Sequence, residues 1–401
     1  MITLEKVKKA ADLIREIIIM TPLVHSPALS RQFKGEIFLK LENLQKTGSF
    51  KIRGAANRIL SDINRIGHAG VVAASAGNHA QGVALAAKKA GVPAAIVMPE
   101  WASITKQEAT RAYGGEVIIS GQSIGESLEK AKELAKEEGR ILIHPYDDPD
   151  VIAGQGTIGL EILGNLNDVD MIIVPVGGGG LISGIASVVK ALKPETKVIG
   201  VQSEACPSAY ESLKKGRIVT VNSSLSIADG ISVKQTGKLN FRIIRKYLDD
   251  IVLVRESDIA AAVLMLLERK KILAEGAGAV PLAALMSGAI KVKKGSRTVL
   301  LISGGNVDSP LLGRIIRQGL INNGRIIRFS VCLDDVPGAL SGLLALVSSL
   351  KANVLHILHH RSARNVPIYS TIVELEIETR GPAHVREITG NLKKAGYYID
   401  I

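Results

Sequence analysis

Residues 171–181 read Met171-Ile172-Ile173-Val174-Pro175-Val176-Gly177-Gly178-Gly179-Gly180-Leu181. An uninterrupted apolar run that meets glycines and then a helical pattern predicts a buried strand turning directly into a helix. The same arrangement occurs at 70–79, where a helix is expected from Asn78 to about Ala90, and at 299–306. Further apolar runs lie at 94–98 and 197–201. This β–α–β rhythm predicts an α/β fold of parallel sheets that helices cover on both faces.

Strand-to-helix glycine turns expose backbone N–H groups, which bind phosphate and carboxylate groups. The four glycines 177–180 suit one phosphate. A dinucleotide site is the rival interpretation, with Glu204 as the ribose acceptor, but Ile182 or Ser183 stands where its third glycine is required. The chain also lacks a Gly-Lys-Ser/Thr phosphate loop. A tight turn would need only one or two glycines, so a single phosphate is favoured.

The turn Ser75-Ala76-Gly77-Asn78-His79 suits a substrate carboxylate, with the Asn78 amide available to a ring oxygen. An ordinary α/β turn fits this stretch equally well.

Ser303, in Ser303-Gly304-Gly305-Asn306, ends a predicted strand, and active sites of open parallel sheets lie at such strand ends. Alone it is only a strand-end serine. Glu275 either lies near such a site or caps a helix.

Lys51 lies in Ser49-Phe50-Lys51-Ile52-Arg53-Gly54, where a helix is expected to begin near Phe50. The helix dipole and burial both lower the pKa of a first-turn lysine. A neutral amine forms Schiff bases and removes protons. Alternatively, Lys51 is one solvated cation among 50 lysines and arginines. Combined with three anion-binding turns, the amine predicts an aldehyde cofactor with a phosphate tail that binds an amino acid.

The bulk composition excludes several classes of protein. The net charge is +12, but basic residues alternate with acidic ones, as in residues 129–133, and only 3% of residues are aromatic. Nucleic-acid binding is therefore not expected. The chain has two cysteines and no apolar run long enough for a membrane span, which favours the cytoplasm. Neither the cysteines nor His356, His359 and His360 predict a metal site.

A length of 401 residues predicts two or three domains. The catalytic region is expected over 1–312, with a smaller subdomain at about 45–145 and a crossover near Asp147–Asp150. A linker is expected at 313–325. Residues 326–401 show the order β-α-β-β-α-β, which is typical of ferredoxin-like α+β domains.

Together these motifs resemble the fold-type II pyridoxal-phosphate enzymes, and within them the threonine dehydratases (threonine ammonia-lyases), over nearly the whole chain. Ser49–Ala55 is similar to the family's cofactor-lysine motif and Ser75–Gly82 to its substrate loop. Gly177–Leu181 is similar to its phosphate loop, and Ser303–Asn306 to the stretch that faces the pyridine nitrogen. Residues 335–340 resemble an ACT regulatory module. The implied fold has two parallel-sheet subdomains and a C-terminal ferredoxin-like domain.

The resemblance implies the cofactor pyridoxal 5'-phosphate and the β-elimination of water from L-threonine, with L-serine as a second substrate. The products would be 2-oxobutanoate, or pyruvate from serine, and ammonia. Lys51 would form the Schiff base and act as the general base. The implied cofactor-binding residues are Lys51, Phe50, Asn78, Gly177, Gly178, Gly179, Gly180, Leu181 and Ser303. The implied substrate-binding residues are Ser75, Ala76, Gly77, Asn78 and His79.

Three alternatives stay open. The chain could be a serine dehydratase or racemase of the same family, a catalytically inactive regulatory protein that binds amino acids, or a nicotinamide oxidoreductase. Ala76 stands where related racemases have a serine base, which argues against racemisation. No metal is expected, since Tyr210 replaces one carboxylate of a cation site that some relatives have near Glu204.

The ACT-like module implies an amino-acid effector and a homo-oligomer, either a dimer or a tetramer. Its expected regulatory residues are Gly338, Ala339, Leu340 and Asn353. The expected context is amino-acid metabolism under allosteric control, with isoleucine biosynthesis as its pathway.

Overall fold

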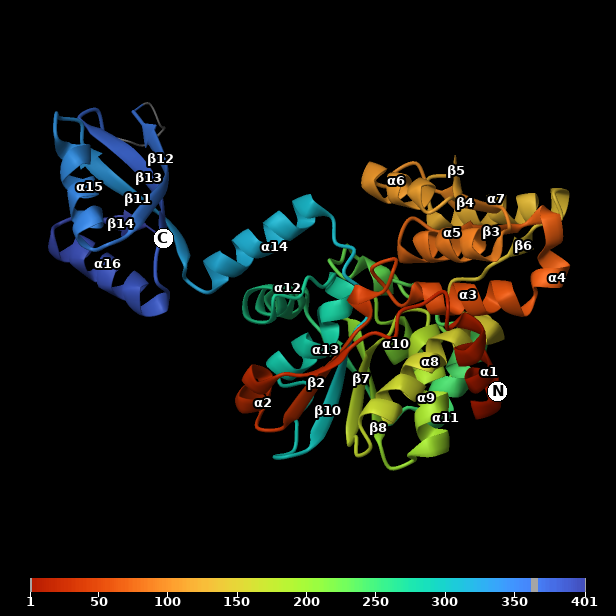
Figure 1. Ribbon diagram of the computed structural model, residues 1–401. Coiled ribbons are helices and arrows are strands. Elements are labelled where there is room, and N and C mark those ends of the chain that lie inside the picture. Colours follow the sequence, from red (N-terminus) through yellow and green to blue (C-terminus); the bar gives the residue numbers. More distant parts are fainter. Residues whose placement is uncertain (1, 362–366, 401) are drawn as a thin grey trace. The chain divides into compact units, whose positions relative to one another are not determined.

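The computed structural model describes residues 2–361 and 367–400 (Figure 1). The chain divides into two compact units, residues 1–311 and 312–401. The first unit contains two parallel sheets and the second an antiparallel sheet. The predicted α/β architecture is therefore confirmed.

The smaller sheet of the first unit has the strand order β5-β4-β3-β6, and its strands are parallel. Its strands are β3 (Val71–Ala74), β4 (Ala94–Met98), β5 (Glu116–Ile119) and β6 (Ile141–Leu142). The helices of this part of the chain are α3 (Lys51–Ser61), α4 (Ile63–Ile66), η2 (Gly67–Ala69), α5 (Asn78–Ala90), α6 (Ile104–Ala112) and α7 (Ile124–Glu137).

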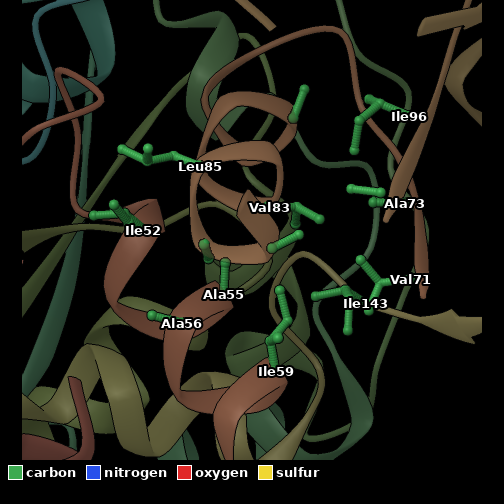
Figure 2. Close-up of a cluster of buried hydrophobic side chains, with 14 of the residues drawn as sticks. Ile52, Ala55, Ala56, Ile59, Val71, Ala73, Val83, Leu85, Ile96 and Ile143 are labelled. Carbon is green, nitrogen blue, oxygen red and sulfur yellow. The ribbon is translucent and has the colours of Figure 1, made fainter. Parts of the chain in front are cut away.

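Helices cover both faces of this sheet because its strands are apolar on both sides. Val71 and Ala73 pack with helices α3 and α5 in one buried cluster (Figure 2). Val72 and Ala74 point the other way and pack with α7. Each fully buried aliphatic side chain contributes roughly 1.5–3 kcal/mol. The predicted helix over Asn78–Ala90 is confirmed.

The larger sheet has the order β1-β2-β10-β7-β8-β9, in which β1 pairs antiparallel with β2 and the other pairs are parallel. Its strands are β1 (Leu23–His25), β2 (Glu36–Leu41), β7 (Met171–Pro175), β8 (Lys197–Ser203), β9 (Asp250–Val254) and β10 (Arg297–Ile302). The surrounding helices are α1 (Leu4–Ile14), α2 (Pro27–Phe33), η1 (Glu42–Leu44), α8 (Pro149–Asn165), α9 (Gly180–Leu192), α10 (Ser208–Lys215), η3 (Asp229–Ile231), α11 (Lys238–Tyr247), α12 (Glu256–Met265), η4 (Leu266–Lys270) and α13 (Gly276–Met286).

This topology brings three predicted turns to the carboxyl ends of parallel strands. The turn after β3 leads into α5, the glycines after β7 lead into α9, and residues 303–306 follow β10. Strands β10 and β7 are direct neighbours. In open parallel sheets, ligands bind at this edge.

The second unit has an antiparallel sheet of order β12-β13-β11-β14. Its elements are β11 (Ile326–Asp334), α15 (Ala339–Ser349), β12 (Asn353–His360), β13 (Ser370–Glu378), α16 (Pro382–Lys394) and β14 (Ile399–Asp400). The predicted β-α-β-β-α-β order is confirmed. Phe329, Val331 and Leu375 form its core with the two helices because β11 and β13 alternate buried and polar residues. Helix α14 (Ser309–Asn322) contains most of the residues expected to form a linker.

Within residues 2–361 and 367–400, no helix is both long enough and apolar enough to cross a bilayer.

Candidate functional site

Lys51 begins helix α3, as the sequence predicted. Its Nζ atom donates a hydrogen bond to the Pro145 carbonyl oxygen at 3.1 Å and lies 5.2 Å from the centre of the Phe50 ring. Burial lowers the pKa of Lys51 to about 8, although the charge of Glu275 acts in the opposite direction. The side chain is therefore much closer to neutrality than an ordinary lysine.

The segment before Lys51 is hydrogen-bonded to the loop that follows β10. Ser49 pairs with Gly304 in an isolated bridge, and the Phe50 N–H donates to the Ser303 carbonyl at 3.1 Å. Ser303 is buried, and its hydroxyl has no hydrogen-bond partner among the described residues. The structure thus brings Lys51 and Ser303, which are far apart in sequence, into one site.

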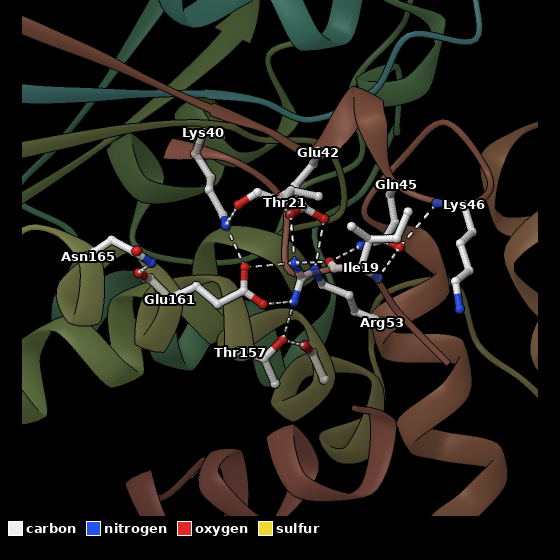
Figure 3. A network of polar contacts seen from close by, with 11 residues as sticks. Ile19, Thr21, Lys40, Glu42, Gln45, Lys46, Arg53, Thr157, Glu161 and Asn165 are labelled. Carbon is white, nitrogen blue, oxygen red and sulfur yellow. Dashed lines mark hydrogen bonds and ion pairs between the residues drawn. The ribbon is translucent and has the colours of Figure 1, made fainter. Parts of the chain in front are cut away.

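A buried network of charges anchors the first turn of α3 (Figure 3). The Arg53 guanidinium donates to Glu42 at 2.8 Å and to Glu161 at 2.6 Å, and Lys40 also pairs with Glu161. Lys40, Glu42 and Arg53 are fully buried. Two cations and two anions balance, so the network links α3 to η1 and α8 without a net buried charge.

The loop Gly177–Leu181 presents unpaired hydrogen-bond donors. None of the described residues accepts a hydrogen bond from the five backbone N–H groups of 177–181. A Cβ atom at Gly178 would lie 2.4 Å from the Tyr146 ring, and Gly179 has a positive φ of 98°. Glycine is therefore needed here for space and for conformation. Consecutive free N–H groups at the start of a helix favour a bound anion.

The turn Ser75–His79 offers a second set of donors. The Gly77 N–H is held by the Ser75 hydroxyl oxygen at 3.2 Å, whereas no described residue accepts from the N–H groups of Ala76, Asn78 and His79. The His79 Nε2 atom lies 3.0 Å from the Ile143 carbonyl oxygen, so it is the protonated nitrogen. Burial lowers the pKa of His79 to about 3, which keeps the ring neutral.

Glu275 and Asn306 meet at Asn78. The Asn78 Nδ2 atom donates to both Glu275 carboxylate oxygens at 2.9 Å, and Asn306 Nδ2 donates to Asn78 Oδ1 at 2.8 Å. Burial raises the pKa of Glu275 to about 7. Sequence reasoning left the position of Glu275 open and gave Asn306 no individual role. The contacts of Pro145 and Tyr146 were also missed, because no motif marks the segment after β6.

Other predicted residues lie elsewhere. Within the second unit, Gly338, Ala339 and Leu340 line a pocket of about 330 Å³ together with His359, Arg361 and Thr371. Asn353 does not line this pocket. It begins β12, where it pairs with Glu378 of β13, whereas the pocket lies near the opposite end of β12. No cluster of histidine, cysteine and acidic side chains suited to a metal ion occurs in the described parts of the chain.

Comparisons with known proteins agree with this geometry. Residues 14–304 match the family described as pyridoxal-phosphate dependent enzymes. The chain is 50% identical to the L-threonine ammonia-lyase of Thermotoga maritima over 403 residues, which covers 100% of both chains. The structure of the processed form of threonine deaminase isoform 2 from Solanum lycopersicum has a TM-score of 0.73 and 36% identity, covering 78% of this chain and 93% of that one. The structure of maize serine racemase has a TM-score of 0.75 and 36% identity, covering 80% of this chain and 99% of that one.

Proposed function

The chain belongs to the family of pyridoxal-phosphate-dependent enzymes, and from this premise we propose that it is an L-threonine ammonia-lyase. It eliminates water from L-threonine and gives 2-oxobutanoate and ammonia, and it accepts L-serine as a second substrate, giving pyruvate. The observation that supports this best is a partly buried lysine, with a pKa lowered to about 8, in one site with two sets of free backbone donors.

The described residues fit pyridoxal 5'-phosphate. The N–H groups of Gly177–Leu181, which we call the phosphate cradle, would hold its phosphate. Lys51 would bind its aldehyde, and the unpartnered Ser303 hydroxyl would bond its ring nitrogen. Phe50 would pack against the ring, and the Asn78 amide would bond its ring oxygen. When bound, the cofactor supplies an aldehyde that captures amines and a conjugated ring that accepts electrons.

The chain's own residues bind the substrate and move its proton. The free N–H groups of Ala76, Asn78 and His79 bind the substrate carboxylate. The neutral Lys51 amine removes the proton from the α-carbon, because burial favours its basic form. His79 stays neutral next to this amine and adds no competing positive charge. Loss of the β-hydroxyl as water leaves an enamine. Hydrolysis of this enamine gives the 2-oxo acid and releases ammonia.

The lowered pKa of Lys51 predicts how cofactor capture depends on pH. With a pKa of about 8 in place of 10.5, roughly a tenth of the amine is neutral at pH 7, against less than about a thousandth for an ordinary lysine. In cofactor-free protein, the rate of colour development on adding pyridoxal phosphate should rise with pH and level off above about 8. Stopped-flow absorbance measures this rate. A rate that still climbs tenfold per unit towards pH 10 would contradict the prediction.

A methyl group in the phosphate cradle should weaken cofactor binding. In Gly178→Ala the new Cβ would meet the Tyr146 ring at 2.4 Å, so the loop must move away from its present path. Overpacking of this kind costs about 1–3 kcal/mol, which corresponds to a Kd for the cofactor that is roughly 5- to 150-fold higher. Equilibrium dialysis gives the Kd. Gly164→Ala on α8, where the added Cβ meets nothing within 4 Å, is the matched control and should leave the Kd unchanged.

Product analysis tests the proposed reaction. The purified protein with pyridoxal phosphate should release 2-oxobutanoate from L-threonine and, more slowly, pyruvate from L-serine. The serine racemase alternative is favoured only by structural similarity. Ala76 offers no hydroxyl for a second base, so D-serine formation should stay well below pyruvate formation. Dominant D-serine production, or no product from threonine, would contradict the proposal.

We also propose that the second unit is an ACT-like module that binds an amino-acid effector and that the protein is a cytoplasmic homo-oligomer. The pocket next to Gly338–Leu340 supports effector binding, because the turn leads into helix α15 and the paired Arg361 and Asp335 both line the pocket. Activity assays of the wild type and of Arg361→Ala, each with isoleucine and with valine, test whether an effector binds in this pocket.

Sedimentation velocity tests the proposed oligomeric state. A monomer at assay concentration would contradict it.

A further inference from the structure

We propose that Glu275 is a positioning residue for the reaction assigned above. Together with Asn306 it fixes the side-chain amide of Asn78, so that one amide N–H stays free to donate into the site. This inference rests on the proposed function, because the free N–H would donate to the ring oxygen of the cofactor.

Glu275 occupies the N-cap position of helix α13 but does not cap it. Its side chain makes no hydrogen bond to the N–H groups of its own helix. A side chain at this position can stabilise a helix by accepting from its first N–H groups. The carboxylate instead accepts from Asn78 Nδ2 with both oxygens at 2.9 Å. This carboxylate therefore serves the neighbouring side chain rather than its own helix.

Asn306 holds the other side of the Asn78 amide. Its Nδ2 atom donates to Asn78 Oδ1 at 2.8 Å and to the Thr47 carbonyl oxygen at 2.8 Å. An amide NH₂ group has two donors, and Glu275 occupies the direction of one of them. A flipped Asn78 amide would place its oxygen against the Glu275 carboxylate and its NH₂ against that of Asn306. Both contacts would be repulsive, so a single orientation is selected.

The Glu275 carboxylate is buried in close contact with Gly304. The residue is 5% exposed, and a Cβ atom at Gly304 would lie 2.5 Å from Glu275 Oε1. The first glycine of Ser303-Gly304-Gly305-Asn306 thus makes room for the carboxylate, and the last residue supplies the amide that opposes it. Burial and the charge of Asp229 raise the pKa of Glu275 to about 7, whereas the Asn78 hydrogen bond, Lys106 and Lys51 limit this rise by favouring the ionised form.

Three variants of the full-length protein test the proposal. Glu275→Gln keeps an oxygen that accepts from Asn78, Glu275→Leu removes it, and Asn306→Asp replaces the opposing donor with an acceptor. The measurements are the Kd for pyridoxal phosphate and the visible absorption spectrum of the bound cofactor, which do not require turnover. Circular dichroism checks that each variant is folded.

We expect Glu275→Leu and Asn306→Asp to raise the Kd about tenfold, because a positioned hydrogen bond contributes about 1–1.5 kcal/mol. Both should also change the ratio of the visible and near-ultraviolet bands. Glu275→Gln should restore the wild-type spectrum and a Kd within about threefold, since its oxygen still accepts the Asn78 N–H. The proposal is overturned if Glu275→Gln is as impaired as Glu275→Leu, or if the spectrum of Asn306→Asp is unchanged.

If Glu275→Leu does not fold, the other two variants decide. The proposal then requires that Glu275→Gln keeps the wild-type spectrum and that Asn306→Asp changes it, and the opposite result for either variant overturns it. A wild-type protein that binds the cofactor but releases no 2-oxobutanoate contradicts the proposed function alone. The spectra of the variants would still decide whether Glu275 positions Asn78.

Discussion

Replacing Lys51 with alanine is expected to abolish ammonia release from L-threonine. The variant loses both the amine that binds the cofactor aldehyde and the base that removes the α-proton. Removal of a positioned base alone costs about a hundred- to ten-thousandfold, so the combined loss should be at least roughly a thousandfold in kcat. The assay follows 2-oxobutanoate at saturating threonine with added pyridoxal phosphate.

Lys130→Ala provides the matched control, because Lys130 lies on helix α7 and its side chain forms an exposed ion pair with Glu133. Its activity should equal that of the wild type. Circular dichroism should show that Lys51→Ala keeps its secondary structure, since among the described residues the Lys51 Nζ atom donates a single hydrogen bond, to the Pro145 carbonyl oxygen. Undiminished ammonia release by Lys51→Ala would refute the assigned roles.

Arg53→Met should cause a large loss of stability. Arg53 is fully buried and neutralises Glu42 and Glu161. Methionine would leave two buried carboxylates with only Lys40 to balance them, and breaking a buried ion pair from one side costs about 3–5 kcal/mol. Urea unfolding followed by circular dichroism should show a clearly lower midpoint. Activity should fall as well, because Arg53 lies two residues after Lys51 and holds the first turn of α3.

Arg65→Met is the comparison for this prediction. Arg65 is exposed and lies 3.6 Å from Asp62 in a surface pair, and such pairs contribute about 0–1 kcal/mol. Its unfolding midpoint should stay close to that of the wild type. Equal midpoints for Arg53→Met and Arg65→Met would show that the buried network is not a main support of α3.

The sequence predicted the elements that present the site because each signal was local. Met171–Pro175 is buried on both faces and so consists of apolar residues, and the glycines at 177–180 are required by close contacts and backbone conformation. The place of Lys51 in the first turn of α3 was predicted for a similar reason, since it begins a helix whose small residues pack closely. The alternating pattern of β11 likewise predicted a sheet with one buried face.

Contacts between distant segments could not be predicted in this way. Asn78 and Glu275 are 197 residues apart, Lys51 and Pro145 are 94 apart, and Lys40 and Glu161 are 121 apart. Each depends on how the crossovers arrange helices around the two sheets, and a single sequence carries no periodic signal for that arrangement. The sequence therefore indicated that Glu275 is an acidic residue before a helix, but it did not predict the hydrogen bonds that Glu275 accepts from Asn78.

The most direct test of the central claim is borohydride reduction of the protein with bound pyridoxal phosphate, followed by peptide mass spectrometry. Reduction should bleach the yellow colour and leave the cofactor covalently attached to Lys51. A label at another lysine, or a protein that binds no cofactor and cannot be labelled, would contradict the assignment of Lys51 as the cofactor-binding amine.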